Sequence, residues 1–185
     1  VVLEPDNYWY KQTLASHYRK RGENEKAVDV IEDIVDRFPS RLEPLMELVD
    51  LYDRLKDYKK VIHTLDRLEK IDGKSEQISM EKFRIYLQTK DLERAFAEIE
   101  NLVQEYPYEM RYLNILGDVY LENGRIEEAY SIFKKVLKDE PGYAPAMLSL
   151  VSYYEKTGQD SLYRSQLDSV LLNRKVDNEM KVNIM

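Results

Sequence analysis

Residues 110–143 read MRYLNILGDVYLENGRIEEAYSIFKKVLKDEPGY, and this stretch decides the fold. Its first half places apolar or small residues at the i, i+3, i+4, i+7 spacing of one helix face: Leu113, Leu116, Gly117 and Tyr120. Gly124 interrupts the pattern, because glycine enters the left-handed conformation past a helix end without steric cost. A second periodic run follows and ends at Pro141, which cannot continue a helix. The stretch therefore predicts a helix-turn-helix hairpin, with helices at residues 110–122 and 126–138.

Two small residues, Gly117 and Ala129, mark where the two predicted helices should approach each other most closely. A large side chain at either position would push the helices apart. We therefore expect Gly117 to face the second helix near Ala129.

The same columns of residue types recur every thirty-four residues along the chain, without insertion or deletion. One column holds only tyrosine: Tyr18, Tyr52, Tyr86, Tyr120 and Tyr154. The predicted units span residues 8–41, 42–75, 76–109, 110–143 and 144–177. A fixed period of this length predicts an α-solenoid, in which each unit packs on its neighbours.

The columns resemble the tetratricopeptide repeat (TPR) at seven positions: Leu116, Gly117, Tyr120, Gly124, Ala129, Phe133 and Pro141. The resemblance implies an all-α, right-handed superhelix of five hairpins, with residues 1–185 forming a single solenoid domain. Lys56 and Lys90 depart from the family by replacing the turn glycine. If these lysines stay left-handed, each costs about 1 kcal/mol.

Both ends of the chain continue the repeat in frame. Pro5 lies thirty-four residues before Pro39, so residues 1–7 are expected to be the tail of a preceding unit. Residues 178–185 are expected to begin a further helix. We interpret the chain as a segment of a longer repeat protein, with a frayed natural terminus as the alternative. Apolar residues at such ends, for example Leu3 and Val182, predict self-association.

Composition excludes several classes of function. The net charge of −7 and the absence of a basic stripe argue against a nucleic-acid partner. No apolar run approaches the roughly 20 residues of a membrane span, so direct membrane insertion is not expected. The chain has no cysteine, which excludes disulfides and thiolate metal sites and leaves the compartment open.

Catalytic and metal-binding patterns are missing from the sequence. The two histidines, His17 and His63, lie in different units and have no metal-ligand spacing around them. The glycines are explained by turns, unit ends and close helix contact rather than by a phosphate loop. We expect a protein that is not an enzyme and that has no cofactor and no metal.

The resemblance implies that the first helices line a concave groove for a peptide or a partner helix. An apolar seam is expected there, with Met46, Met80 and Leu148 in one column and Leu87 and Leu121 in another. Methionine suits such a site because it adapts to varied shapes. Alternatively, these side chains only pack between neighbouring first helices. The predicted partner-binding residues are Trp9, Met46, Asp50, Met80, Arg84, Leu87, Arg111, Asn114, Asp118, Leu121 and Leu148.

The predicted function is therefore a non-catalytic protein-protein interaction scaffold. The lysines and asparagines with which some family members grip a C-terminal carboxylate are absent from the matching columns, so chaperone-tail binding is not implied. Two alternatives stay open: a sensory or regulatory arm of a longer signalling protein, and part of a glycan-handling bacterial envelope protein.

Overall fold

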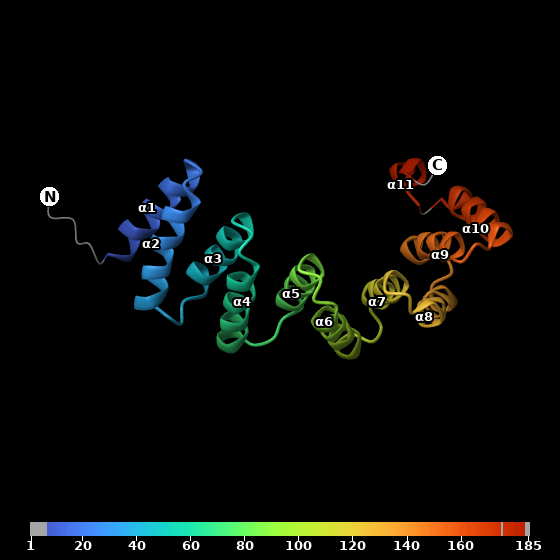
Figure 1. The fold of residues 1–185 in the computed structure, drawn as a ribbon, viewed down its shortest axis with the longest axis horizontal. Coiled ribbons are helices and arrows are strands. Elements are labelled where there is room, and N and C mark those ends of the chain that lie inside the picture. Colours follow the sequence, from blue (N-terminus) through green and yellow to red (C-terminus); the bar gives the residue numbers. More distant parts are fainter. Residues whose placement is uncertain (1–6, 175, 184–185) are drawn as a thin grey trace. The chain divides into compact units, whose positions relative to one another are not determined.

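The computed structural model describes residues 7–174 and 176–183. Within these residues the chain forms helices and turns and no strand (Figure 1). The helices are α1 (Tyr8–Lys20), α2 (Asn24–Arg37), α3 (Leu42–Arg54), α4 (Tyr58–Asp72), α5 (Glu76–Gln88), α6 (Leu92–Glu105), α7 (Met110–Glu122), α8 (Ile126–Asp139), α9 (Ala144–Lys156), α10 (Asp160–Leu172) and α11 (Asn178–Asn183). The predicted all-α fold is confirmed, and α7 and α8 lie within one residue of their predicted bounds.

The chain divides into two compact units at Ala95 and Phe96, inside α6. Unit 1 contains α1 to α5 and unit 2 contains α7 to α11. In unit 1 the pairs α1–α2 and α3–α4 pack as hairpins, and α2 also contacts α3. In unit 2 the pairs α7–α8 and α9–α10 do the same, and α8 contacts α9. Each unit therefore stacks hairpin on hairpin, as the period predicts.

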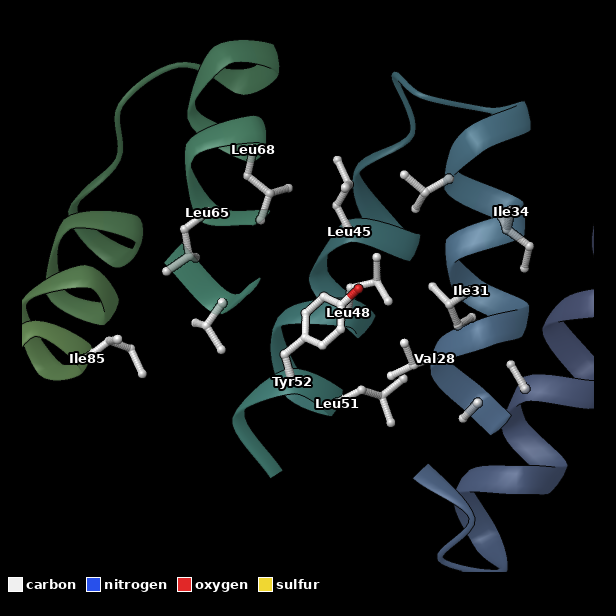
Figure 2. Packing of buried hydrophobic residues seen from close by; sticks show 14 residues of the cluster. Val28, Ile31, Ile34, Leu45, Leu48, Leu51, Tyr52, Leu65, Leu68 and Ile85 are labelled. Atoms are coloured by element: carbon white, nitrogen blue, oxygen red, sulfur yellow. The ribbon is translucent and has the colours of Figure 1, made fainter. Parts of the chain in front are cut away.

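The core of unit 1 is a continuous layer of aliphatic side chains with one tyrosine. Figure 2 shows Leu45, Leu48 and Tyr52 of α3 lying between α2, which contributes Ile31, and α4, which contributes Leu65. These residues are buried, and they recur at helical spacing on their elements. Burying one such side chain contributes about 1.5–3 kcal/mol, so the apolar columns supply most of the stacking energy.

The turn residue after each first helix is left-handed, whether or not it is glycine. The φ angle is 77° at Gly124, and it is 58° at Lys56 and 59° at Lys90, so both lysines keep the left-handed conformation of the glycine they replace. In these turns, the backbone N–H two residues after the C-cap of the first helix donates a hydrogen bond to the backbone carbonyl of the tyrosine from the tyrosine column. This bond measures 2.9 Å from Asp57 to Tyr52 and 2.9 Å from Arg125 to Tyr120. It satisfies a carbonyl that would otherwise be unpaired at the helix end.

The column tyrosines also join neighbouring hairpins through their side chains. The Tyr52 hydroxyl donates to Glu32 on α2, and the Tyr120 hydroxyl donates to Glu100 on α6 at 3.1 Å. A cation covers each ring: the Lys60 ammonium lies 4.9 Å from the Tyr52 ring centre, and the Arg125 guanidinium lies 3.9 Å from that of Tyr120. Burial and the hydrogen bond to Glu32 raise the pKa of Tyr52, so its hydroxyl stays a donor at neutral pH.

Gly117 lies where the two helices of the α7–α8 hairpin touch. A Cβ added to Gly117 would lie 2.5 Å from Cε1 of Phe133 and 3.1 Å from Cγ2 of Ile132. These contacts with α8 confirm the close approach of the two helices expected at Gly117, while the expected proximity of Ala129 stays a prediction. Alanine is small but lies one turn earlier on α8, whereas the Phe133 ring reaches across to the glycine.

The chain ends are described only in part. Residues 1–6, which include Pro5 and Leu3, lie outside the described residues, as does Ile184, whereas Asn7 caps α1 by accepting a hydrogen bond from the Trp9 N–H at 2.9 Å. At the other end α11 begins at Asn178, where a further helix was expected, and the Val182 side chain is exposed. Among the residues of α10, only Val170 is buried.

Candidate functional site

The predicted partner-binding residues all lie on first helices, and they divide between the two units. Trp9 lies on α1, Met46 and Asp50 on α3, and the next three on α5, all in unit 1. The remainder belong to unit 2: Arg111, Asn114, Asp118 and Leu121 on α7 and Leu148 on α9. We describe the two faces separately.

The face of unit 1 carries apolar side chains that are open to solvent. Met46 on α3 is 55% exposed and Leu87 on α5 is 37% exposed, although both are large hydrophobic residues. Met80 is partly exposed, and Trp9 on α1 is exposed. The alternative that Met46 and Leu87 only fill space between neighbouring helices does not fit this exposure.

The charged residues of the same face pair with one another across the helices. Arg19 on α1 contacts Glu47 at 3.2 Å and Asp50 at 3.3 Å, both on α3. Asp50 also accepts from Arg54 at 3.1 Å. Asp50, which the sequence predicts as a partner-binding residue, is therefore already paired with two arginines of this chain.

A second set of ion pairs joins α3 to α5. Arg84 contacts Asp53 of α3 at 2.8 Å and Glu81 of its own helix at 2.6 Å. Hydrogen bonds to Glu81 and then Asp53 raise the pKa of Arg84. Exposed pairs of this kind contribute only about 0–1 kcal/mol each.

The α7 residues of unit 2 do not continue an apolar seam. Leu121 is only 3% exposed, so the expectation that it lines an open groove is wrong. Leu148 is partly buried against the cluster that contains Met147 and Val151. The helix face that carries Leu121 turns toward neighbouring side chains rather than toward solvent, which column membership alone does not reveal.

A polar cluster occupies the space between α7 and α9. Asn114 is 4% exposed, and its Nδ2 donates to Oδ2 of Asp118 at 2.9 Å and to the Ser149 hydroxyl at 3.1 Å. The Ser149 hydroxyl in turn donates to the carbonyl of Pro145 at 2.9 Å. The cluster therefore fixes the Asn114 amide, while Asp118 stays partly exposed.

Asp118 has no cationic partner among the described residues. Burial, together with the nearby charge of Glu122, raises the pKa of the Asp118 carboxyl to about 6. The nearby Ser149 hydroxyl and the hydrogen bond from Asn114 oppose this rise. The Oδ1 atom of Asn114 is buried without a hydrogen-bond donor. Buried carboxylates are normally paired, so this arrangement is unusual.

Arg111, which the sequence placed beside the seam, lies against an aromatic ring. Its guanidinium is 4.7 Å from the ring centre of the buried Tyr112 and donates to the Tyr112 hydroxyl at 2.7 Å. This contact gives Arg111 a structural role at the start of α7.

Sequence reasoning missed Glu47, Glu81 and Ser149. They occupy one column, each a single residue after the methionine column, and they supply partners to the charged or polar side chains of the face. The signal was present in the repeat, because neighbouring columns on a first helix meet the preceding first helix.

A hollow of about 340 Å³ in unit 1 lies away from these residues, between α2 and the α3–α4 turn. The Tyr52–Glu32 hydrogen bond described above lies in its wall. Within residues 7–174 and 176–183 no cluster of three metal-ligating side chains occurs. In the same part of the chain no helix is long and apolar enough to cross a membrane.

The family model described as "Tetratricopeptide repeat" matches residues 80–157. Two solved structures superimpose on almost the whole chain. MamA from Desulfovibrio magneticus RS-1 does so with a TM-score of 0.68 and 17% identity, covering 95% of this chain and 99% of that one. YrrB, described as a TPR protein with an unusual peptide-binding site, gives a TM-score of 0.63 and 14% identity, covering 94% and 89%. Residues 80–157 thus match the tetratricopeptide repeat family, and the chain as a whole has the fold of these repeat proteins.

Two curated relatives are longer proteins than this chain. Anaphase-promoting complex subunit 3 of Schizosaccharomyces pombe is 29% identical over 114 residues, which is 62% of this chain and 17% of the relative. Lipopolysaccharide assembly protein B of Haemophilus influenzae is 24% identical over 154 residues, which is 80% of this chain and 39% of the relative. The chain thus spans about a fifth to two fifths of the length of these relatives, and the likeness covers the repeat region only.

Proposed function

We propose that this protein binds a peptide or a partner helix on the first-helix face of unit 1. Met46, Met80 and Leu87 act as the apolar anchors. Proteins with this repeat are protein-interaction scaffolds, and the chain has that fold. No catalytic role is assigned to any residue.

The observation that carries the proposal is the exposure of Met46 and Leu87 on a face whose charges pair internally. Exposed apolar side chains rimmed by polar ones mark interaction sites. The arginine–carboxylate pairs join α1, α3 and α5, so the face is ordered before a partner arrives. Such preorganisation lowers the entropic cost of binding.

The relatives offer limited support for a particular partner. The description of YrrB as having a peptide-binding site is consistent with the proposal, although at 14% identity it shows only a shared fold. Neither a signalling arm nor a glycan-handling role is favoured by a residue of the described structure. Self-association through the apolar residues at the chain ends, of which Val182 is exposed, stays a prediction that the oligomeric state in solution tests.

Selection from a random peptide library displayed on phage tests the proposed face. The wild-type protein should enrich a family of peptides with apolar residues at regular spacing. A Met46→Asp/Leu87→Asp variant should bind the enriched peptide at least about thirtyfold more weakly, because two anchors would be replaced by charges in a desolvated contact. Its melting temperature should stay within a few degrees of the parent, since both side chains are already exposed.

The matched control is Ile71→Asp/Leu92→Asp. Ile71 and Leu92 are 41% and 39% exposed and lie on the second helices α4 and α6. This variant carries the same added charge and should bind the peptide like the parent. If both variants lost peptide affinity equally, or if neither lost it, the proposal that the peptide binds the first-helix face of unit 1 would be contradicted.

A further inference from the structure

We infer that Asp118 in unit 2 is an anchor for a basic side chain, arginine or lysine, of a peptide partner. The site lies between α7 and α9 and consists of Asp118, Asn114 and Ser149. The inference rests on the proposed role of first-helix faces in peptide binding, but it concerns a different unit and has a separate test.

The comparison of equivalent positions shows what is missing at Asp118. Asp50 occupies the same column two repeats earlier, and its carboxylate contacts Arg19 at 3.3 Å and Arg54 at 3.1 Å. The position equivalent to Arg54 beside Asp118 is Glu122, which repels the carboxylate instead of pairing with it. Asp50 thus pairs with two arginines, whereas Asp118 pairs with none among the described residues.

The charged groups around Asp118 are committed elsewhere. Lys156 at the end of α9 donates its ammonium to the carbonyl of Leu121 at 2.8 Å, and Arg111 lies on the Tyr112 ring. Tyr143, at the cap of α9, faces both Arg111 and Asp118, and it is neutral with a raised pKa caused first by burial. Within the described part of the chain, no charged group of α8 contacts Asp118.

The hydrogen-bonding groups of the cluster point to a ligand rich in donors. Both Nδ2 bonds of Asn114 are used internally, Asn114 Oδ1 lacks a donor, and Asp118 is an acceptor with a negative charge. A guanidinium or an ammonium brings several N–H donors and the opposite charge. Because Asp118 is partly buried, such a pair is screened less than the exposed pairs of unit 1.

A titration of the isotope-labelled full chain followed by NMR tests this inference. The probes are N-acetyl-arginine amide and N-acetyl-citrulline amide, which have nearly the same shape and differ in charge. At pH 7.5 the arginine probe should cause saturable shifts of the Asp118 and Ser149 amides at millimolar concentration, larger than those at the exposed Asp29. The citrulline probe should leave Asp118 and Ser149 unshifted.

Two further conditions should remove the arginine response. In Asp118→Asn the carboxylate is gone while the hydrogen bond from Asn114 has an acceptor, so the fold is kept. At pH 5 the carboxyl of the wild type is protonated, because its pKa is about 6. Absence of an arginine-specific shift at pH 7.5, or a shift that persists in Asp118→Asn, would overturn the inference.

The outcome is distinguishable from failure of the proposed function. The Met46→Asp/Leu87→Asp variant should keep the arginine response, because these residues belong to unit 1. An arginine response without enrichment of any peptide supports the Asp118 anchor and contradicts the peptide-binding face of unit 1. Enrichment of peptides without an arginine response supports the peptide-binding face of unit 1 and contradicts the Asp118 anchor.

Discussion

The substitution Gly117→Leu is expected to destabilise the protein by about 3 kcal/mol. The reason is the contact between α7 and α8, where even a Cβ would lie 2.5 Å from Phe133. A leucine adds three more carbons to this contact, and overpacking in a filled core costs typically about 1–3 kcal/mol and occasionally more. Either the Phe133 ring or the helix axis has to move.

Urea denaturation of the whole protein measures this loss of stability, and Gly124→Ala is the matched control in the same hairpin. Gly124 has a φ of 77° and open space around its Cα, so alanine there meets backbone strain of about 1 kcal/mol and no clash. Gly117→Ala should cost more than Gly124→Ala, and Phe133→Leu should relieve part of that cost. Equal losses at the two glycines would contradict the close packing of α7 on α8.

The substitution Asp118→Asn is expected to stabilise the protein at pH 7 by about 3 kcal/mol. Burial raises the pKa of this carboxyl from 3.8 to about 6, so ionising it costs more in the folded than in the unfolded protein. A shift of one pKa unit corresponds to about 1.4 kcal/mol, and the hydrogen bond from Asn114 survives the substitution. The protein therefore keeps a destabilising charge at Asp118, as binding sites often do.

The pH dependence gives the sign of this effect. Well below pH 3.8, the pKa of an unperturbed aspartate, Asp118 is protonated in both states, so the pH-dependent difference in stability between the two proteins should vanish. As the pH rises from 4 through 6, the folded wild type holds a proton that the unfolded chain has lost, and its stability falls relative to the variant. Denaturation at pH 4, 5, 6 and 7 measures the difference. A difference independent of pH would show that the Asp118 carboxylate is not strained by burial.

The sequence predicted the helices well because the repeat makes each residue type appear five times in one environment. Glycine at three turns identified the left-handed position, and the two lysines at equivalent positions had to adopt it if the period was kept. The tyrosine column likewise identified a fixed packing position. For the helices and turns, local periodicity and turn chemistry decide the structure, and both are visible in one sequence.

The candidate site was only partly predictable, because it depends on contacts between helices of different repeats. Column membership placed Met46 and Leu87 on the first helices, but it also placed the buried Leu121 there. It gave no indication that Arg84 pairs with Asp53 while Asp118 lacks a cation. The partner of a long charged side chain depends on which residues of neighbouring helices lie within its reach. A neighbouring repeat can place an opposite charge there, or a like charge that repels it.

The most direct test of the central claim is a methyl NMR map of the complex between the protein and a peptide enriched from the library. We expect the largest shifts at the methyl groups of Met46, Met80 and Leu87 on α3 and α5, with those of Ile71 and Leu92 unchanged. Shifts concentrated on the second helices α4 and α6, with Met46 and Leu87 unaffected, would contradict partner binding on the first-helix face.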